Sequence, residues 1–110
     1  MRPTIMEVNI KNFNENINYI QEYVGHKKLI PVIKANGYGT YINKNLELIN
    51  KFDIVSVAIV QEAVELRKLG FKKEILVLNQ PYVGDTKEIE ENNITVGISD
   101  ISFLEESLHL

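Results

Sequence analysis

Residues 29–39 decide how the chain is organised, and they read Leu29-Ile30-Pro31-Val32-Ile33-Lys34-Ala35-Asn36-Gly37-Tyr38-Gly39. An apolar run of strand length ends at a lysine, and a Gly-Tyr-Gly turn follows it. Because nearly all lysines in folded proteins are solvated, a lysine at a strand end is ordinarily a surface residue. Whether Lys34 has a function depends on where the rest of the chain places this strand end.

Strand and helix patterns alternate along the whole sequence. Short segments rich in β-branched and apolar residues predict strands at 4–10, 29–33, 52–58, 74–78 and 94–98. Apolar residues at helical spacing predict helices at 13–24, 42–49, 61–69, 85–93 and 101–108.

Capping residues and one proline refine these boundaries. Asn9 or Asn12 is placed to cap the first helix, and Ser99 or Asp100 is placed to cap the last.

Gly25 and Gly70 are placed to end the helices at 13–24 and 61–69. Pro31 has no backbone N–H, so we expect its strand to lie at a sheet edge or to pair through other positions.

This alternation is typical of a parallel sheet with crossover helices, either doubly wound or barrel-like. The predicted strand cores 54–58 and 75–78 are apolar on both faces, as expected for a sheet covered by helices. An eight-stranded barrel needs about 250 residues, so 110 residues supply about half of one. The sequence stops at Leu110 within an apolar stripe, and we therefore expect a longer parent chain.

Composition excludes several classes of function. With 45% hydrophobic residues, 25% charged residues and a net charge of -3, the chain offers no electrostatic reason to bind nucleic acid or an anionic membrane. It has no cysteine, which excludes disulfides, thiol nucleophiles and cysteine metal ligands. His26 is expected to be a solvated turn residue, and His109 has no partner carboxylate at metal-ligand spacing, so no metal site is predicted. Neither a signal peptide nor a membrane span is recognisable, and the expected compartment is the cytoplasm.

Lys34 stands where chemistry is expected in such folds, because βα proteins gather their active sites at the carboxyl ends of the strands. A lysine in a partly dry site can lose its proton and form a Schiff base with a carbonyl. The glycines beside Tyr38 let backbone approach a ligand closely, and its hydroxyl can donate to a phosphate oxygen. The pattern is compatible with an aldehyde-bearing phosphate cofactor.

The same stretch resembles the pyridoxal-phosphate (PLP) lysine motif of alanine racemases, which usually reads Val-[Val/Ile]-Lys-Ala-[Asn/Asp]-[Ala/Gly]-Tyr-Gly-His. Further segments resemble the family in the same order along essentially all of the chain. They are Arg2-Pro3-Thr4, Glu7-Val8-Asn9-Ile10, Asn16-Ile17, Val57-Ala58, Glu62-Ala63, Leu66-Arg67 with Gly70, and Ile75-Leu76-Val77-Leu78.

The resemblance implies a fold and a set of site residues. Residues 1–110 would form the N-terminal portion of a PLP-binding TIM-type (β/α)8 barrel domain in a homodimeric racemase of alanine. Lys34 would hold PLP as an internal aldimine and act as one of two bases, and Tyr38 would contact the cofactor phosphate. Val32 and Leu78 align with apolar residues near the cofactor ring. Core packing would explain both residues without a cofactor, and it is the preferred interpretation.

Two departures from the family limit the expected activity. Gly39 is followed by Thr40-Tyr41, whereas the family usually continues with histidine. The second base of the family is a tyrosine in a C-terminal β domain, supplied across the dimer interface, and that region and the second half of the barrel are absent here. We therefore expect this chain alone to racemise alanine poorly or not at all.

Two further hypotheses remain open. The chain could be a single-domain PLP-binding module, like the cofactor-homeostasis proteins, although those relatives lack the Arg-Pro-Thr opening and the Lys-Ala-Asn-Gly-Tyr-Gly sequence. It could also be a non-catalytic fragment that folds through self-association, since half a barrel leaves two sheet edges open. Tyr82, in the loop after the fourth predicted strand, is expected to pack within that loop, with a role beside the substrate as the alternative.

Overall fold

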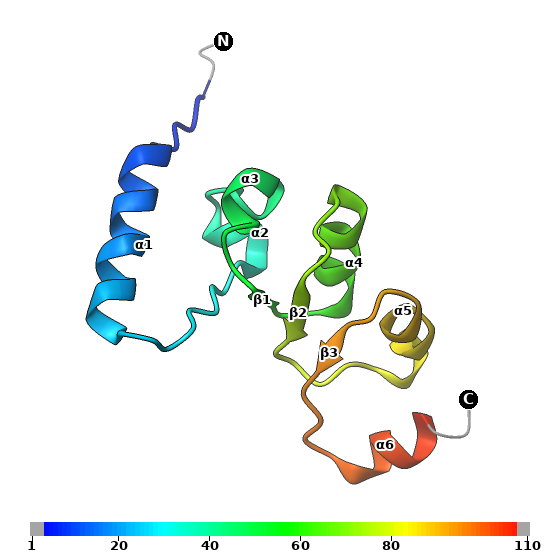
Figure 1. Ribbon diagram of the computed structural model, residues 1–110. Coiled ribbons are helices and arrows are strands. Elements are labelled where there is room, and N and C mark those ends of the chain that lie inside the picture. Colours follow the sequence, from blue (N-terminus) through cyan, green and yellow to red (C-terminus); the bar gives the residue numbers. More distant parts are fainter. Residues whose placement is uncertain (1–3, 108–110) are drawn as a thin grey trace.

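The computed structural model describes residues 4–107, and Figure 1 shows how their elements follow one another around a short central sheet. The helices are α1 Ile10–Val24, α2 Lys34–Tyr38, η1 Ile42–Lys44, α3 Leu46–Ile49, α4 Val60–Leu69, η2 Val83–Asp85, α5 Thr86–Glu91 and α6 Ile101–Ser107. The strands are β1 Ile54–Val57, β2 Glu74–Val77 and β3 Thr95–Val96. No helix in this part of the chain is long and apolar enough to cross a membrane.

The strands are parallel and lie in the order in which the sequence places them. β1 pairs with β2 and β2 pairs with β3, while Val32 forms a parallel bridge to Ser56 on the outer side of β1. A doubly wound sheet reverses its strand order at a switch point, whereas a β/α barrel adds each strand beside the previous one. The fold is therefore α/β, with parallel βα units that form part of a TIM-type (β/α)8 barrel, incomplete in this chain.

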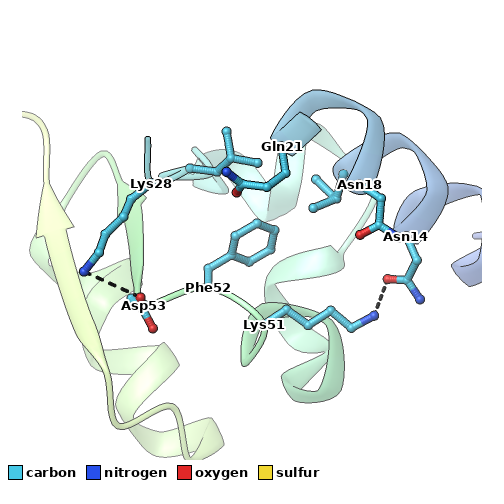
Figure 2. Close-up of a pocket in the computed structure, with 9 residues that line it drawn as sticks. Asn14, Asn18, Gln21, Lys28, Lys51, Phe52 and Asp53 are labelled. Atoms are coloured by element: carbon cyan, nitrogen blue, oxygen red, sulfur yellow. Dashed lines mark hydrogen bonds and ion pairs between the residues drawn. The ribbon is translucent and has the colours of Figure 1, made fainter. Parts of the chain in front are cut away.

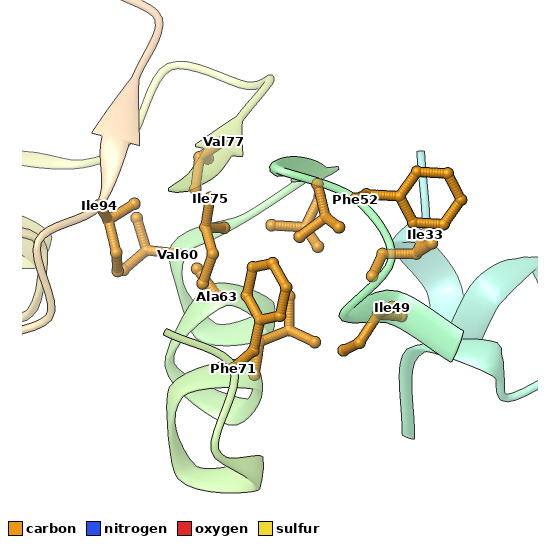
Figure 3. Close-up of a cluster of buried hydrophobic side chains, with 12 residues drawn as sticks. Ile33, Ile49, Phe52, Val60, Ala63, Phe71, Ile75, Val77 and Ile94 are labelled. Atoms are coloured by element: carbon orange, nitrogen blue, oxygen red, sulfur yellow. The ribbon is translucent and has the colours of Figure 1, made fainter. Parts of the chain in front are cut away.

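One face of the sheet carries the hydrophobic core. Because side chains alternate along a strand, Val55 and Val57 of β1 and Ile75 and Val77 of β2 point to the same side and are fully buried there. Helices α3 and α4 cover this side, and Figure 3 shows their side chains meeting those of the sheet. The buried cluster comprises Ile33, Ile49, Phe52, Val55, Val57, Val60, Ala63, Leu66, Phe71, Ile75, Val77 and Ile94.

The predicted strand at 4–10 is wrong. Residues 4–9 form no strand, and Ile10 already belongs to α1. Ile5 and Met6 are 75% and 50% exposed, so the alternation of apolar residues buries nothing here. A strand needs a neighbour to satisfy its backbone, and the part of the chain that the structure describes supplies none at this point.

The predicted strands at 29–33 and 94–98 are much shorter than expected. Only Val32 bridges to β1, in a register where Ser56 donates both its backbone N–H and its hydroxyl to the Pro31 carbonyl, at 2.9 and 3.1 Å. The segment lies beyond β1 at the edge of the described sheet, as the proline predicted. β3 keeps only Thr95 and Val96.

Several local predictions are confirmed. Asn9 caps α1 by accepting the Asn12 N–H at 2.9 Å, and Asp100 accepts the Ser102 N–H at 3.0 Å at the start of α6. Helix α4 ends at Gly70, whose φ of 111° lies in the left-handed region. The predicted helix at 42–49 is present as two turns, η1 and α3, and the prediction for His109 lies outside the described residues.

Candidate functional site

Lys34 lies at the carboxyl edge of the sheet, directly after the segment that bridges to β1. The four residues that follow all have left-handed backbone angles, with φ of 52° at Ala35, 54° at Asn36, 64° at Gly37 and 58° at Tyr38. The segment labelled α2 is therefore a left-handed turn. A left-handed conformation costs an L-residue about 1–2 kcal/mol, so the surrounding structure must hold this turn in place.

Hydrogen bonds within residues 33–43 close the turn. Gly37 donates its N–H to the Ile33 carbonyl at 3.1 Å, and Tyr41 donates to the Asn36 carbonyl at 2.7 Å. The Thr40 hydroxyl donates to the Gly37 carbonyl at 2.6 Å. Thr40 stands where the resembling motif has histidine, and in this chain it forms part of the structure of the turn.

The turn brings Tyr38 back beside Lys34. The Lys34 Nζ lies 6.0 Å from the centre of the Tyr38 ring, at the outer limit of a cation–π contact. Lys34 is half-buried, whereas Tyr38 is 67% exposed. An amine and a phenol hydroxyl are thus presented together at one edge of the sheet, within reach of a molecule in solution.

Val32 and Leu78 are not core residues, contrary to the preferred interpretation of the sequence. They are 40% and 46% exposed, because they lie on the face of the sheet opposite α3 and α4, which no helix covers in the described residues. Both leave apolar surface exposed, Val32 two residues before Lys34 and Leu78 directly after the end of β2.

Glu62 is a site residue whose part in the geometry the sequence did not reveal. Its Oε2 accepts the Ala35 N–H at 2.7 Å, and its Oε1 accepts the N–H groups of Ala58 and Ile59 at 2.9 and 3.2 Å. One carboxylate therefore joins the turn after Lys34 to the end of β1 and the start of α4. Its third position in the helix was a signal for capping, but nothing in the sequence indicated the contact with residue 35.

A small hollow of about 190 Å³ lies at the carboxyl ends of β1 and β2, where Ile59, Asn79 and Tyr82 contribute to its wall. Tyr82 is 84% exposed, so it does not pack within its loop as expected. Tyr82 lies at the same edge of the sheet as Lys34 and lines this hollow.

A larger hollow of about 440 Å³ lies at the opposite edge, between α1 and the residues that precede the strands. Figure 2 shows its polar lining, in which Lys28 faces Asp53 at 3.6 Å and Lys51 donates to Asn14. Both members of the Lys28–Asp53 pair are largely exposed, so the pair adds little stability. The hollow reflects the loose docking of α1, which buries no residue fully, and it is remote from the carboxyl edge.

The residues at the carboxyl edge fit PLP. Lys34 supplies an amine for the aldehyde, Tyr38 supplies a hydroxyl for the phosphate, and exposed apolar surface at Val32 and Leu78 can cover a flat ring. No group of three metal-ligating side chains lies together within residues 4–107.

Comparisons with known proteins identify a family for the chain and support its fold. The family profile described as "Alanine racemase, N-terminal domain" matches residues 8–109. The alanine racemase of Aquifex aeolicus (strain VF5) is 41% identical over 107 residues, which cover 94% of this chain and 31% of that protein. The crystal structure of alanine racemase from E. faecalis has a TM-score of 0.84 at 25% identity, covering 92% of this chain and 28% of that one. The histidine racemase from Leuconostoc mesenteroides subsp. sake NBRC 102480 has a TM-score of 0.78 at 25% identity, covering 86% and 26%.

The sequential parallel strands define the class, a β/α-barrel domain. The chain belongs to the alanine racemase family, and it corresponds to the N-terminal part of that family's barrel domain. It spans less than a third of the length of these relatives.

Proposed function

We propose that residues 1–110 form the N-terminal, lysine-bearing portion of a PLP-dependent racemase that interconverts L- and D-alanine. In this proposal Lys34 binds PLP covalently and serves as a base, Tyr38 holds the phosphate, and Val32 and Leu78 flank the ring. The remaining barrel strands, the β domain and a homodimeric partner would complete the site. The single observation that carries the proposal is the placement of Lys34 and Tyr38 together at the carboxyl edge of the sheet.

PLP supplies the electron sink that acidifies the α-hydrogen of a bound amino acid. The Lys34 Nζ would take up or deliver that proton on one face of the substrate carbon. Racemisation needs a second group to move a proton on the opposite face, and in the family this group is a tyrosine outside these 110 residues. Within the chain, the left-handed turn fixes where the amine stands, and Tyr38 would fix the phosphate end of the cofactor.

The relatives support alanine as the first substrate to test, because the matched proteins include several alanine racemases. The similarity to a histidine racemase makes histidine the best competing amino acid for the same assay.

Borohydride trapping tests the role of Lys34 directly. The chain is incubated with PLP, reduced, digested and mapped by mass spectrometry, and we expect saturable labelling at Lys34. Lys34→Arg should abolish this label, because arginine does not condense with the aldehyde. Lys28→Arg is the matched control, since Lys28 is an exposed lysine at the other edge of the sheet.

Labelling spread evenly over surface lysines, or unchanged in Lys34→Arg, would contradict the proposal. The same samples, assayed with L- and D-alanine, should show little turnover because the second base is missing. A rate of about 1 s⁻¹ or faster from the 110-residue chain would show that the predicted need for a second base is wrong.

Self-association is a second candidate function. It is favoured by the open edges of the described sheet and by the exposed apolar side chains Val32 and Leu78 on its uncovered face. Sedimentation of the trapping samples separates the two, since a tight dimer without any Lys34 label supports self-association alone.

A further inference from the structure

Glu62 joins three backbone segments that are far apart in the sequence. Its two carboxylate oxygens accept N–H groups from Ala35, at the start of the left-handed turn, and from Ala58 and Ile59, after the end of β1. The contact with Ala35 spans 27 residues of sequence and, at 2.7 Å, is the shortest of the three. A bond from an N–H to an ionised carboxylate is about twice as strong as a neutral one.

The Ala35 N–H belongs to the peptide unit that joins Lys34 to the turn. The Ile33 N–H, just before Lys34, donates to the Ser56 carbonyl of β1 at 2.9 Å, and the other hydrogen bonds that the structure records for residues 34–40 come from within residues 33–43. Glu62 alone connects the turn to another element of the fold by a side-chain hydrogen bond in this part of the chain. The orientation of the peptide after Lys34 is therefore set by a helix that packs on the core.

The position of Glu62 on α4 suits a side chain that accepts hydrogen bonds. The helix dipole is positive at its first turn, where Glu62 lies. Ile59, the residue before the helix, has no side-chain oxygen to cap it, so Glu62 satisfies this end of the helix and the turn at the same time.

We propose that Glu62 is a positioning residue for Lys34: it fixes the left-handed turn, and thereby places the amine of Lys34 and the hydroxyl of Tyr38 toward a phosphate-bearing aldehyde. Glu62 touches neither substrate nor cofactor in this proposal. The inference rests on the proposed PLP chemistry for its effect on ligand binding, but the hydrogen bond by which Glu62 holds the turn can be measured without PLP.

Amide hydrogen exchange and PLP affinity together test this proposal. Glu62→Gln keeps one acceptor oxygen and places an NH₂ group against a backbone N–H, so it should remove the hydrogen bonds that one of the two carboxylate oxygens accepts. We expect faster exchange at Ala35 and a PLP affinity lowered about ten- to a hundredfold, the range for loss of one charged hydrogen bond. Glu62→Asp, which keeps the charge but is one methylene shorter, should act in the same direction and serves if Glu62→Gln does not fold.

Glu65→Gln is the matched control. It removes the same charge from an exposed position three residues further along the helix, where no backbone N–H is bound in the part of the chain that the structure describes. It should exchange and bind PLP like the wild-type chain.

The outcomes separate this inference from the proposed function. If the wild-type chain forms no Lys34 adduct, the proposed function fails and exchange at Ala35 alone decides the role of Glu62. If the adduct forms equally in wild-type, Glu62→Gln and Glu65→Gln chains, the positioning role is overturned. A wild-type Ala35 amide that exchanges as fast as an unfolded one overturns it without any variant.

Discussion

Helix α4 carries an acidic side chain near its start, which binds backbone N–H groups, and a basic side chain near its end, which binds backbone carbonyls. At its start, Glu62 collects three N–H groups around the turn after Lys34. At its end, Arg67 donates to four carbonyls that precede the strands, those of Phe71, Lys73, Asn92 and Asn93, at 2.6–3.1 Å. Both arrangements agree with the helix dipole.

The difference lies in what each end fixes. Arg67 joins loops at the amino edge of the sheet, where barrel proteins keep residues for stability, whereas Glu62 acts at the carboxyl edge, where they keep residues for function. Partial burial lowers the pKa of the Arg67 guanidinium below its ordinary value, but the group stays charged at neutral pH. One helix thus serves stability and site geometry through separate residues, and these two roles should be separable by mutation.

Loss of Arg67 should have the largest effect on stability. Arg67→Met removes the donors of four carbonyls and should lower the free energy of unfolding by about 3 kcal/mol. In conditions where the variant remains folded, trapping of PLP at Lys34 should be unchanged. Denaturant unfolding followed by circular dichroism measures the first effect, and Lys68→Met is the control at an exposed neighbouring position. A variant with normal stability, or a folded variant that has lost PLP labelling at Lys34, would show that the two ends of α4 do not have separate roles.

A change within the turn should do the reverse, with a smaller loss of stability and a larger loss of cofactor binding. Gly37 has a φ of 64°, and a Cβ atom there would lie 2.8 Å from the Thr40 hydroxyl oxygen. We expect Gly37→Ala to cost about 1–2 kcal/mol, with weaker PLP binding in titration.

The Thr40→Ala background sharpens this test. Removing the hydroxyl frees the space beside residue 37, so part of the cost of Gly37→Ala should disappear in the double variant. Strict additivity of the two substitutions would show that Thr40 does not restrict the turn.

The sequence predicted the part of the fold that depends on repeated patterns. Helices α1 and α4, their terminal glycines and the parallel direction of the strands follow from apolar spacing and from the alternation of elements. The predicted strand at 4–10 failed because alternation alone does not say whether a neighbour exists to pair with.

The sequence predicted where the candidate site lies but not its geometry. Lys34 was recognisable because a predicted strand ends there, but the left-handed backbone of Ala35 and Tyr38 was not, since L-residues ordinarily avoid it. The role of Glu62 could not be predicted either, because its partner lies 27 residues away and is a backbone N–H, which every residue except proline carries.

The smallest expected effect concerns Asp100, which also lies at the carboxyl edge but has no contact with the lysine turn in the described residues. Hydrogen bonds from Ser102 lower the pKa of the Asp100 carboxyl below its ordinary value of 3.8. Because the folded state favours the ionised form, this contribution is complete above pH 3.8 and is lost as the pH falls through the lower folded pKa. The Ser102 amide resonance should therefore titrate with a midpoint below 3.8 and stay constant in Asp100→Asn, which can still cap the helix. If the Ala35 amide resonance shifted with the same midpoint, the two parts of the carboxyl edge would be coupled. The turn after Lys34 would then not be held by Glu62 independently of Asp100, as the comparison of the two ends of α4 requires.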